Sequence, residues 1–400
     1  MLDLLIKNVR THSSPVLFHL GVKNNRLQFV ASSARTSKTV EGEGGIVLPP
    51  FVEMHHHADT YKAGERVGEN KSGTIEEGIA IWDSAKSQLV KKELTAQMED
   101  LVSTFIGQGI LYTRWMIDVS EPGLKALSCA IAVKERYKNT VGIEITAFPQ
   151  LGMKEPWKRE LLEKALQMGA DQVSAVPHLE ESEEQEDAAV QECFRLAQQY
   201  KKGIHIFCDE TENPDSMSSS KIAEAAVKGE HHDLSITISH VNALSYYEET
   251  KAAETIQKIK QAGIHVISCP LINSTTIGKS LDSRHAARGI TRVKALRDQG
   301  VNVCVAHDDI KTPFYPFGNG NMLQAGYMMA HLAQFTTEPE LISLVDMLTY
   351  NGAKAMNVQP YGIKEDGPAE FLLYKENDLF SLFTEHSKPF AVCKNGIIIS

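Results

Sequence analysis

The stretch Ile46 to Asp59, IVLPPFVEMHHHAD, decides how the rest of the chain is interpreted. It is an apolar run with a Pro-Pro break, and it ends in three consecutive histidines. Because side chains alternate faces along a β-strand, His55 and His57 point to one side and His56 to the other. Two imidazoles on one face at the end of a buried strand predict a metal site. A His-rich loop or hydrogen-bonded core histidines are the alternatives.

The composition predicts a globular chain with a large core. The 400 residues are 42% hydrophobic and carry a formal charge of -10 without a basic run, which argues against binding to nucleic acid or a membrane surface by charge. The N-terminus does not resemble a signal peptide, and no apolar run reaches the length of about 18 residues that a membrane span needs. The scattered cysteines form no C-x-x-C motif, which argues against a zinc ribbon and predicts free thiols in a reducing, cytoplasmic compartment.

Apolar, strand-like runs alternate with helical stretches through the middle of the chain. Eight runs rich in Val and Ile predict strands that are buried on both faces, and therefore a parallel sheet: 46–57, 110–119, 142–150, 172–178, 203–210, 235–243, 265–273 and 302–309. Eight βα units predict an α/β fold, a (β/α)8 TIM-type barrel. An open doubly wound sheet is the alternative, but no G-x-G-x-x-G follows the first strand.

Short β-like segments at both ends of the chain predict a second, smaller unit. Residues 1–48 contain several such pieces, and residues 359–400 have the same texture. A sheet made from the first segment alone would be too small to be stable. We therefore predict a composite β-sandwich domain from residues 1–48 plus 359–400, beside a catalytic barrel at residues 49–358.

In a barrel of this kind the active-site residues lie at the carboxyl ends of the strands. Two imidazoles with one carboxylate suit a single divalent ion, Zn²⁺, Fe²⁺ or Mn²⁺. Such an ion makes hydroxide available near neutral pH, and a nearby Glu and His would carry the protons. The predicted strand ends supply these side chains: His55 and His57, Gln150, Cys208–Glu210, His240, and His307–Asp309.

Each of these residues also has a purely structural explanation. Asp308 and Asp309 could lie in a solvated loop or cap the next helix. Glu210 lies in the acidic stretch DETENPD, which could equally be a solvated loop. His240 could be a hydrogen-bonded core histidine, and Gln150 could be a turn residue.

With these residues in hand, the chain resembles the bacterial cytosine deaminases of the amidohydrolase superfamily over most of its length. The resemblance implies a metal-dependent barrel with a small composite β domain, a small heterocyclic substrate and a homo-oligomer. It is carried by LPPFVEMHHHADT (48–60), SGTIEEGIAIW (72–82), AFPQLG (147–152), FCDE (207–210), ISHVNALSY (238–246), CPLIN (269–273) with RGITRVK (288–294), and NVCVAHDDI (302–310) with PFYPFGNGNMLQ (313–324).

The resemblance implies a catalytic role for several matching residues. His55 and His57 match the metal-binding H-x-H of the family. Asp308 matches the aspartate of strand eight, which binds the metal and handles a proton. Glu210 matches the glutamate that relays protons to the ring nitrogen and the leaving amine, and His240 matches the histidine that orients the attacking water.

The resemblance also implies which residues bind the substrate. At two positions this chain differs from the family motifs. Gln150 matches the glutamine that reads the amide edge of a pyrimidine, while Asp309 and Phe314 match residues near the ring. The family's fifth strand ends in H-C-D-E, with a metal-binding histidine, where this chain has Phe207. The family's T-H-V-D on strand two is W-M-I-D here, so Met116 replaces a second histidine.

The departure at Phe207 leaves three outcomes for the metal. His55, His57 and Asp308 alone form a 2-His-1-carboxylate triad, which favours a metal-dependent hydrolytic deaminase of an amino-substituted pyrimidine such as cytosine, or of a related heterocycle. His205, on the same strand face and roughly 6.5 Å deeper, could supply a substitute nitrogen. Loss of the metal would instead favour a catalytically altered or inactive, metal-poor protein that binds a heterocycle against Phe207.

Overall fold

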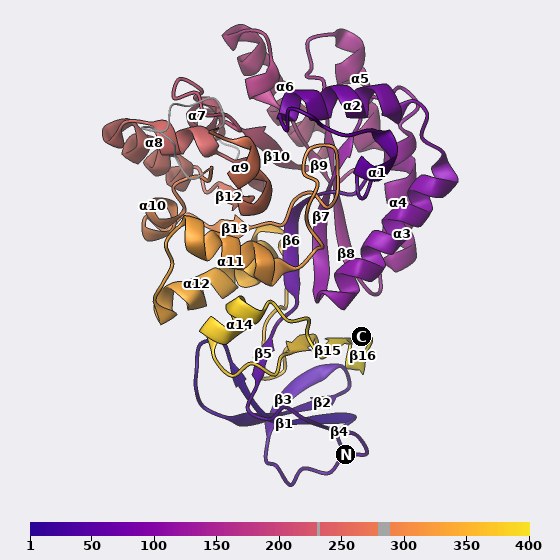
Figure 1. The fold of residues 1–400 in the computed structure, drawn as a ribbon, viewed down its shortest axis with the longest axis vertical. Coiled ribbons are helices and arrows are strands. Elements are labelled where there is room, and N and C mark those ends of the chain that lie inside the picture. Colours follow the sequence, from indigo (N-terminus) through magenta and orange to yellow (C-terminus); the bar gives the residue numbers. More distant parts are fainter. Residues whose placement is uncertain (230–232, 279–288) are drawn as a thin grey trace.

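The structure is a computed structural model that describes residues 1–229, 233–278 and 289–400, so Arg288 of the RGITRVK motif lies outside it. Within this part of the chain, eight parallel strands pair in sequence order from β6 to β13, and β13 comes round beside β6. The predicted α/β barrel is therefore confirmed (Figure 1). Its strands are β6 (Phe51–His57), β7 (Ile110–Asp118), β8 (Gly142–Phe148), β9 (Gln172–Val173), β10 (Gly203–Cys208), β11 (Ile236–His240), β12 (His265–Ser268) and β13 (Val303–Val305).

Helices surround the barrel (Figure 1). They bury an apolar stripe at helical spacing, as α3 does with Leu94, Met98, Leu101 and Phe105. The helices are α1 (Gly64–Val67), α2 (Ile75–Lys86), α3 (Lys91–Gly107), α4 (Lys125–Tyr137), α5 (Pro156–Met168), α6 (Glu183–Tyr200), α7 (Ser218–Lys228), α8 (Glu249–Gln261), α9 (Pro270–Thr276), α10 (Val293–Asp298), α11 (Met322–Leu332), α12 (Glu338–Leu348), α13 (Tyr350–Ala355), α14 (Leu379–Glu385), and the 3-10 turns η1 (Pro177–Leu179) and η2 (Asn242–Tyr246).

The two ends of the chain meet in a second sheet below the barrel (Figure 1). Its strands follow the order β16-β15-β14-β5-β1-β2-β3, with β4 paired to β1. They enclose a separate apolar core that includes Ile6, Leu20 and Phe371. The strands are β1 (Leu4–Thr11), β2 (Phe18–Lys23), β3 (Arg26–Val30), β4 (Thr39–Glu41), β5 (Ile46–Leu48), β14 (Phe371–Leu373), β15 (Ala391–Lys394) and β16 (Ile397–Ile398). The domain limits at 48 and 358 stay predictions.

The predicted strand 46–57 is in fact two strands that belong to different sheets. β5 pairs with β14, where Leu48 faces Leu372, whereas β6 pairs with β7 in the barrel. Pro49 and Pro50 separate them because proline has no backbone N–H to donate to a ladder. The predicted strand 172–178 was also too long, since β9 ends at Val173 and Pro177 begins η1.

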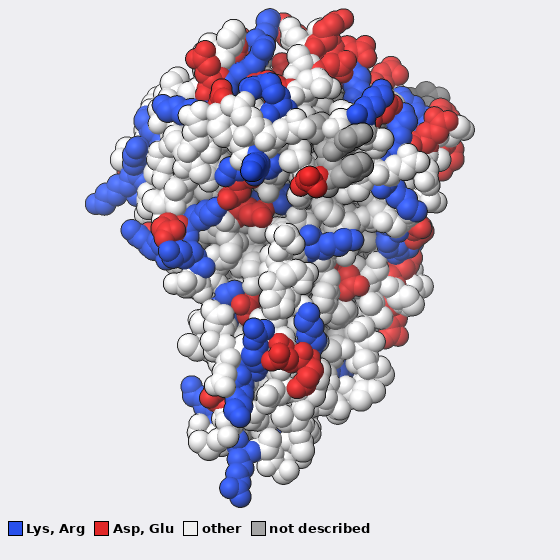
Figure 2. Space-filling view, turned by 180° about the vertical axis from the view of Figure 1, so that it is seen from behind, with Lys and Arg blue, Asp and Glu red and all other residues white. Residues whose placement is uncertain are grey.

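The surface mixes charges of both signs. Figure 2 shows Lys and Arg interspersed with Asp and Glu on the face turned away from Figure 1. All six cysteines are buried free thiols, as the sequence predicted. Among the described residues, helices of the length and apolar character required to cross a membrane are absent.

Candidate active site

The predicted site residues meet in one pocket at the carboxyl ends of the barrel strands. Seven of the eight candidates line it, and the eighth, His55, lies directly beside His57 with 5.5 Å between the ring centroids. The lining residues are His57, Ile75, Gln150, Val176, His178, Leu179, Phe207, Glu210, His240, Ile272, Asp308, Asp309 and Phe314.

His55 and His57, at the end of β6, converge on Asp308, which follows β13. The Nε2 atoms of His55 and His57 lie 3.9 and 3.8 Å from the carboxylate oxygens of Asp308. Ligand atoms of the three residues all lie within 4.8 Å of one another. His55 Nε2 and both Asp308 oxygens are buried without a hydrogen-bond partner. Buried polar atoms left unpaired in this way fit a divalent cation held between them.

Glu53, which was not among the predicted site residues, joins the two chain segments that carry the histidines and Asp308. The carboxylate of Glu53 accepts the backbone N–H of His55 at 3.0 Å and that of His307 at 2.8 Å. It thereby ties β6 to the chain that follows β13. Burial raises the pKa of Glu53 to about 8.

Three residues at strand ends adopt left-handed backbone conformations: His240 has φ +71°, Asp308 has φ +67° and Asp209 has φ +49°. His240 and Asp308 line the pocket, whereas the carboxylate of Asp209 accepts the backbone N–H groups of Ser218 and Ser219 at the start of α7. Such conformations cost about 1–3 kcal/mol each for non-glycine residues and cluster at functional sites. The Val241 N–H donates to Cys208 O at 2.8 Å and helps to hold the turn after β11.

Phe207 packs among the three histidines that surround the proposed cation position. Its ring centroid lies 4.7 Å from that of His55, 5.6 Å from that of His57 and 5.6 Å from that of His240. It also stacks on Phe148 at 4.9 Å. Met116, Phe148, Val176 and Phe207 form a small apolar cluster, of which Phe207 and Val176 line the pocket.

His205 does not replace the missing imidazole, which removes one of the three outcomes considered above. Its Nε2 lies 3.0 Å from His55 Nδ1, and its Nδ1 lies 3.2 Å from Arg114 Nη1. A guanidinium can only donate, so His205 Nδ1 accepts, and His205 Nε2–H donates to His55 Nδ1. Neutral His55 therefore carries its proton on Nε2, which is the atom that faces Asp308.

Glu210 and His240 form a hydrogen-bonded network with Asn273, the last residue of the CPLIN motif. His240 Nδ1 lies 3.3 Å from Glu210 Oε1 and 3.2 Å from Asn273 Oδ1. The amide of Asn273 donates to Glu210 Oε1 at 2.9 Å. Both partners of His240 Nδ1 accept hydrogen bonds, so Nδ1 carries the proton and Nε2 presents a lone pair to the pocket.

The other three predicted site residues also line the pocket. Gln150 follows β8 and Phe314 follows β13, and Asp309 accepts a hydrogen bond from Thr60 Oγ1 at 3.3 Å. His178, in η1, also lines the pocket and interacts electrostatically with Glu210. His178 was not among the predicted site residues, although the predicted strand 172–178 ends on it; it lies in η1 because β9 ends at Val173.

Burial sets the protonation of the pocket. It lowers the pKa of His57 to about 3 and that of His240 to about 4, so both imidazoles are neutral at pH 7. It raises the pKa of Glu210 to about 7. Burial, followed by the charges of Asp309 and Glu210, holds the pKa of Asp308 well above its usual range. A bound cation would stabilise the ionised form of Asp308.

This chain is similar to known proteins of one family. A model of the amidohydrolase family matches residues 64–391. The N-isopropylammelide isopropyl amidohydrolase of Pseudomonas sp. (strain ADP) is 25% identical over 99% of this chain and 97% of the relative. The pterin deaminase of Rhizobium rhizogenes (strain K84 / ATCC BAA-868) is 22% identical over 89% of this chain and 80% of the relative.

A solved structure matches nearly the whole chain. The 5-methylcytosine deaminase from Klebsiella pneumoniae, liganded with 5-fluorocytosine, is 30% identical with a TM-score of 0.93, and the match covers 99% of this chain and 97% of that one. These similarities agree with the superfamily that the sequence motifs indicated. From its fold, its site and these matches, the chain belongs to the amidohydrolase family.

Proposed function

We propose that this protein is a metal-dependent hydrolytic deaminase that acts on an amino-substituted pyrimidine such as cytosine, or on a related heterocycle. The observation that supports it best is the meeting of unpaired buried ligand atoms with the Glu210–His240 pair in one pocket. Deaminases among the similar proteins support the reaction class.

The metal-binding group and His240 would prepare the water. A divalent ion held by His55, His57 and Asp308 would lower the pKa of a water molecule and so supply the nucleophile at neutral pH. His240 Nε2, which presents a lone pair, would orient that water, and the carboxylate of Asp308 would accept its proton.

Glu210 would protonate the substrate. Because burial raises the pKa of Glu210 to about 7, a large share of this carboxyl is protonated near neutral pH and can donate to a ring nitrogen. Protonation of the ring nitrogen makes the ring carbon that bears the amine more electrophilic, so the water adds to that carbon. The exocyclic amine would then take the proton held by Asp308 and leave as ammonia, while the hydroxyl proton returns to Glu210 as the carbon–oxygen double bond forms. Asn273 holds Glu210 in place through its amide.

The other lining residues would bind the ring. Gln150 offers an amide donor and acceptor to the polar edge of a pyrimidine. Phe314 and Phe207 supply apolar surface for the faces of the ring. Phe207, which packs in one cluster with Met116, makes this part of the pocket more apolar than an imidazole would, and this favours a ring without a polar group on that side.

Ammonia release tests this proposal. Purified protein supplemented with Zn²⁺, Fe²⁺ or Mn²⁺ should release ammonia from at least one amino-substituted pyrimidine, purine or triazine. Glu210→Gln should slow the release by about 10²- to 10⁴-fold, whereas Glu183→Gln, at an exposed position on α6, should not. Absence of ammonia release from all of these substrates with every metal would refute the proposal.

A second candidate function follows from Phe207 and His205. Phe207 packs between the ligand histidines, and the His205 hydrogen bond leaves a proton on His55 Nε2. Both features disfavour the binding of a cation at this position. They favour a metal-poor protein that binds a heterocycle without turnover. Stoichiometric tight metal, measured by elemental analysis of protein from metal-supplemented cells, would exclude this candidate.

A further inference from the structure

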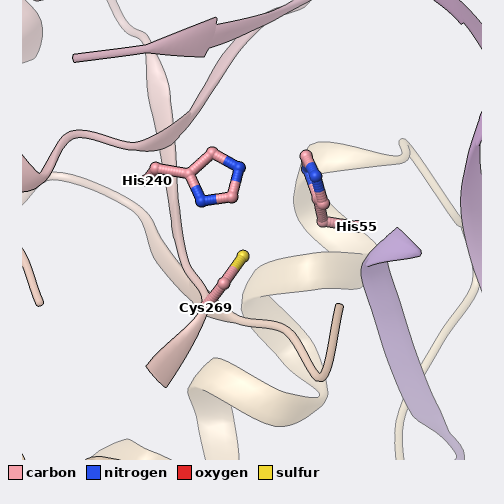
Figure 3. A group of neighbouring side chains, drawn as sticks. All are labelled: His55, His240 and Cys269. Atoms are coloured by element: carbon pink, nitrogen blue, oxygen red, sulfur yellow. The ribbon is translucent and has the colours of Figure 1, made fainter. Parts of the chain in front are cut away.

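Cys269 is a buried thiol that the proposed reaction does not use. It follows β12 and precedes Pro270, the first residue of α9, and it is fully buried. Figure 3 shows its sulfur pointing into the space between the rings of His55 and His240. A nitrogen from each ring and the sulfur all lie within 4.8 Å of one another.

Both imidazoles offer unpaired nitrogens to this space. The rings of His55 and His240 lie 4.8 Å apart between centroids, at an interplanar angle of 81°. The Nε2 atoms of both residues are buried and have no hydrogen-bond partner. His240 Nε2 carries a lone pair, because Nδ1 of that ring donates to Asn273 and Glu210. Two unpaired nitrogens and a thiol sulfur constitute a soft donor set.

We propose that His55, His240 and Cys269 form a soft-metal site that takes a thiophilic divalent ion such as Zn²⁺ or Cd²⁺. In a tetrahedral zinc site, bonds of about 2.0–2.3 Å place neighbouring ligand atoms roughly 3.5 Å apart. The three ligand atoms lie within 4.8 Å of one another, so they need to move only slightly closer together to bind the ion. The thiol loses its proton to solvent when the Cys269 sulfur binds the ion, which then holds a thiolate.

This soft-metal site differs in chemistry from the group formed by His55, His57 and Asp308. A carboxylate suits harder ions such as Mn²⁺, whereas a thiolate selects Zn²⁺ or Cd²⁺. Because both groups use His55, only one of them can hold an ion at a time. The proton on His55 Nε2 opposes both groups equally and so does not decide between them.

Occupancy of the soft-metal site has a functional consequence, which rests on the proposed function. An ion at the soft-metal site takes the His240 lone pair that would otherwise orient the attacking water. Cd²⁺ should therefore inhibit a Mn²⁺-loaded enzyme. Metal binding at the soft-metal site can be tested without any catalytic assay, so the two proposals fail independently.

Titration of the full-length, metal-free protein with Cd²⁺ tests the site. Thiolate-to-cadmium charge-transfer absorption in the ultraviolet should appear and saturate at one equivalent. Burial, followed by the charge of Asp308, raises the pKa of Cys269 well above its usual range, so little thiolate absorbs before the metal is added. Cys269→Ser should remove the band and weaken Cd²⁺ binding at least tenfold.

Two variants serve as controls. Cys304→Ser changes another fully buried thiol, on β13, and should leave the band intact. His57→Asn removes a ligand of the other metal group and should also leave the band. The proposal is overturned if wild-type protein fails to bind Cd²⁺, if it binds one equivalent without the band, or if the band survives in Cys269→Ser.

Discussion

His205 and His55 share a buried hydrogen bond whose direction is set by a third residue. His205 Nε2 lies 3.0 Å from His55 Nδ1, and Arg114 Nη1 lies 3.2 Å from His205 Nδ1. All three residues are fully buried. Because Arg114 can only donate, His205 Nδ1 accepts and His205 Nε2–H donates to His55 Nδ1. Neutral His55 therefore carries its proton on Nε2. A metal-binding histidine usually has the opposite arrangement, with Nδ1–H donating to an acceptor.

Replacing His205 with an acceptor should therefore strengthen metal binding. In His205→Glu, one carboxylate oxygen can accept from Arg114 and the other from His55 Nδ1–H, which leaves His55 Nε2 as a lone pair. We expect the dissociation constant for Zn²⁺ or Mn²⁺ to fall about 10- to 100-fold, the usual size of such effects. Isothermal titration measures it. An unchanged dissociation constant in a folded variant would contradict the assignment of the His55 proton to Nε2.

Phe207→His should restore a fourth ligand to the His55–His57–Asp308 group. The ring of Phe207 already lies 4.7 Å from that of His55, so an imidazole there reaches the same space. A gain of about 1.4 kcal/mol or more, which is tenfold in affinity, is expected in metal titrations. Phe207→Leu removes the aromatic ring without adding a nitrogen and should show no gain. Equal affinities in both variants would mean that the cation position lies elsewhere.

Glu210→Gln should mainly lower kcat. The amide keeps the shape of the side chain and can still bond to Asn273, but it cannot donate a proton as an acid. General acid catalysis contributes about 10²- to 10⁴-fold, and a loss of this size in kcat with little change in KM is expected. Steady-state kinetics on the substrate identified by ammonia release provide the measurement. A change confined to KM would assign Glu210 to binding alone.

The value of kcat/KM should decrease as the pH rises above 7. Burial raises the pKa of Glu210 to about 7, and the proposed acid is active only while protonated. Its active fraction therefore decreases above pH 7, by about tenfold per pH unit once ionisation is nearly complete. His240, whose burial-lowered pKa is about 4, stays neutral throughout this range. A value of kcat/KM that rises between pH 7 and 9 would contradict this assignment.

Gly78→Ala should disturb substrate binding through Phe314. A Cβ at Gly78 would lie 2.7 Å from Phe314 Cδ1, so the ring must shift within the pocket. We expect KM to rise several-fold while metal affinity stays unchanged.

Gly107→Ala, at the end of α3 where a Cβ meets nothing within 4 Å, is the matched control. It should leave KM unchanged and raise Tm slightly, because alanine favours a helix over glycine by about 1 kcal/mol. Equal KM values in the two variants would show that Phe314 does not contact substrate.

The sequence determined the barrel and most of the candidate site, because buried parallel strands are continuous apolar runs whose ends carry the polar residues. His55, Glu210, His240 and Asp308 were predicted in this way. The placement of Pro49–Pro50 between two sheets was not predicted, since the break only has meaning once β14 pairs with β5. The homo-oligomer and the cytoplasmic location stay predictions.

Only the tertiary structure decided how the residues around His55 act. Arg114, His205 and Cys269 lie on three different strands or strand ends, and their spacing along the chain carries no signal of contact. Hydrogen-bond direction depends on which donor faces which nitrogen, and that depends on barrel closure. The triple histidine located the candidate metal site in the sequence, whereas the tautomer of His55 and the nearby thiol of Cys269 depend on packing across the barrel.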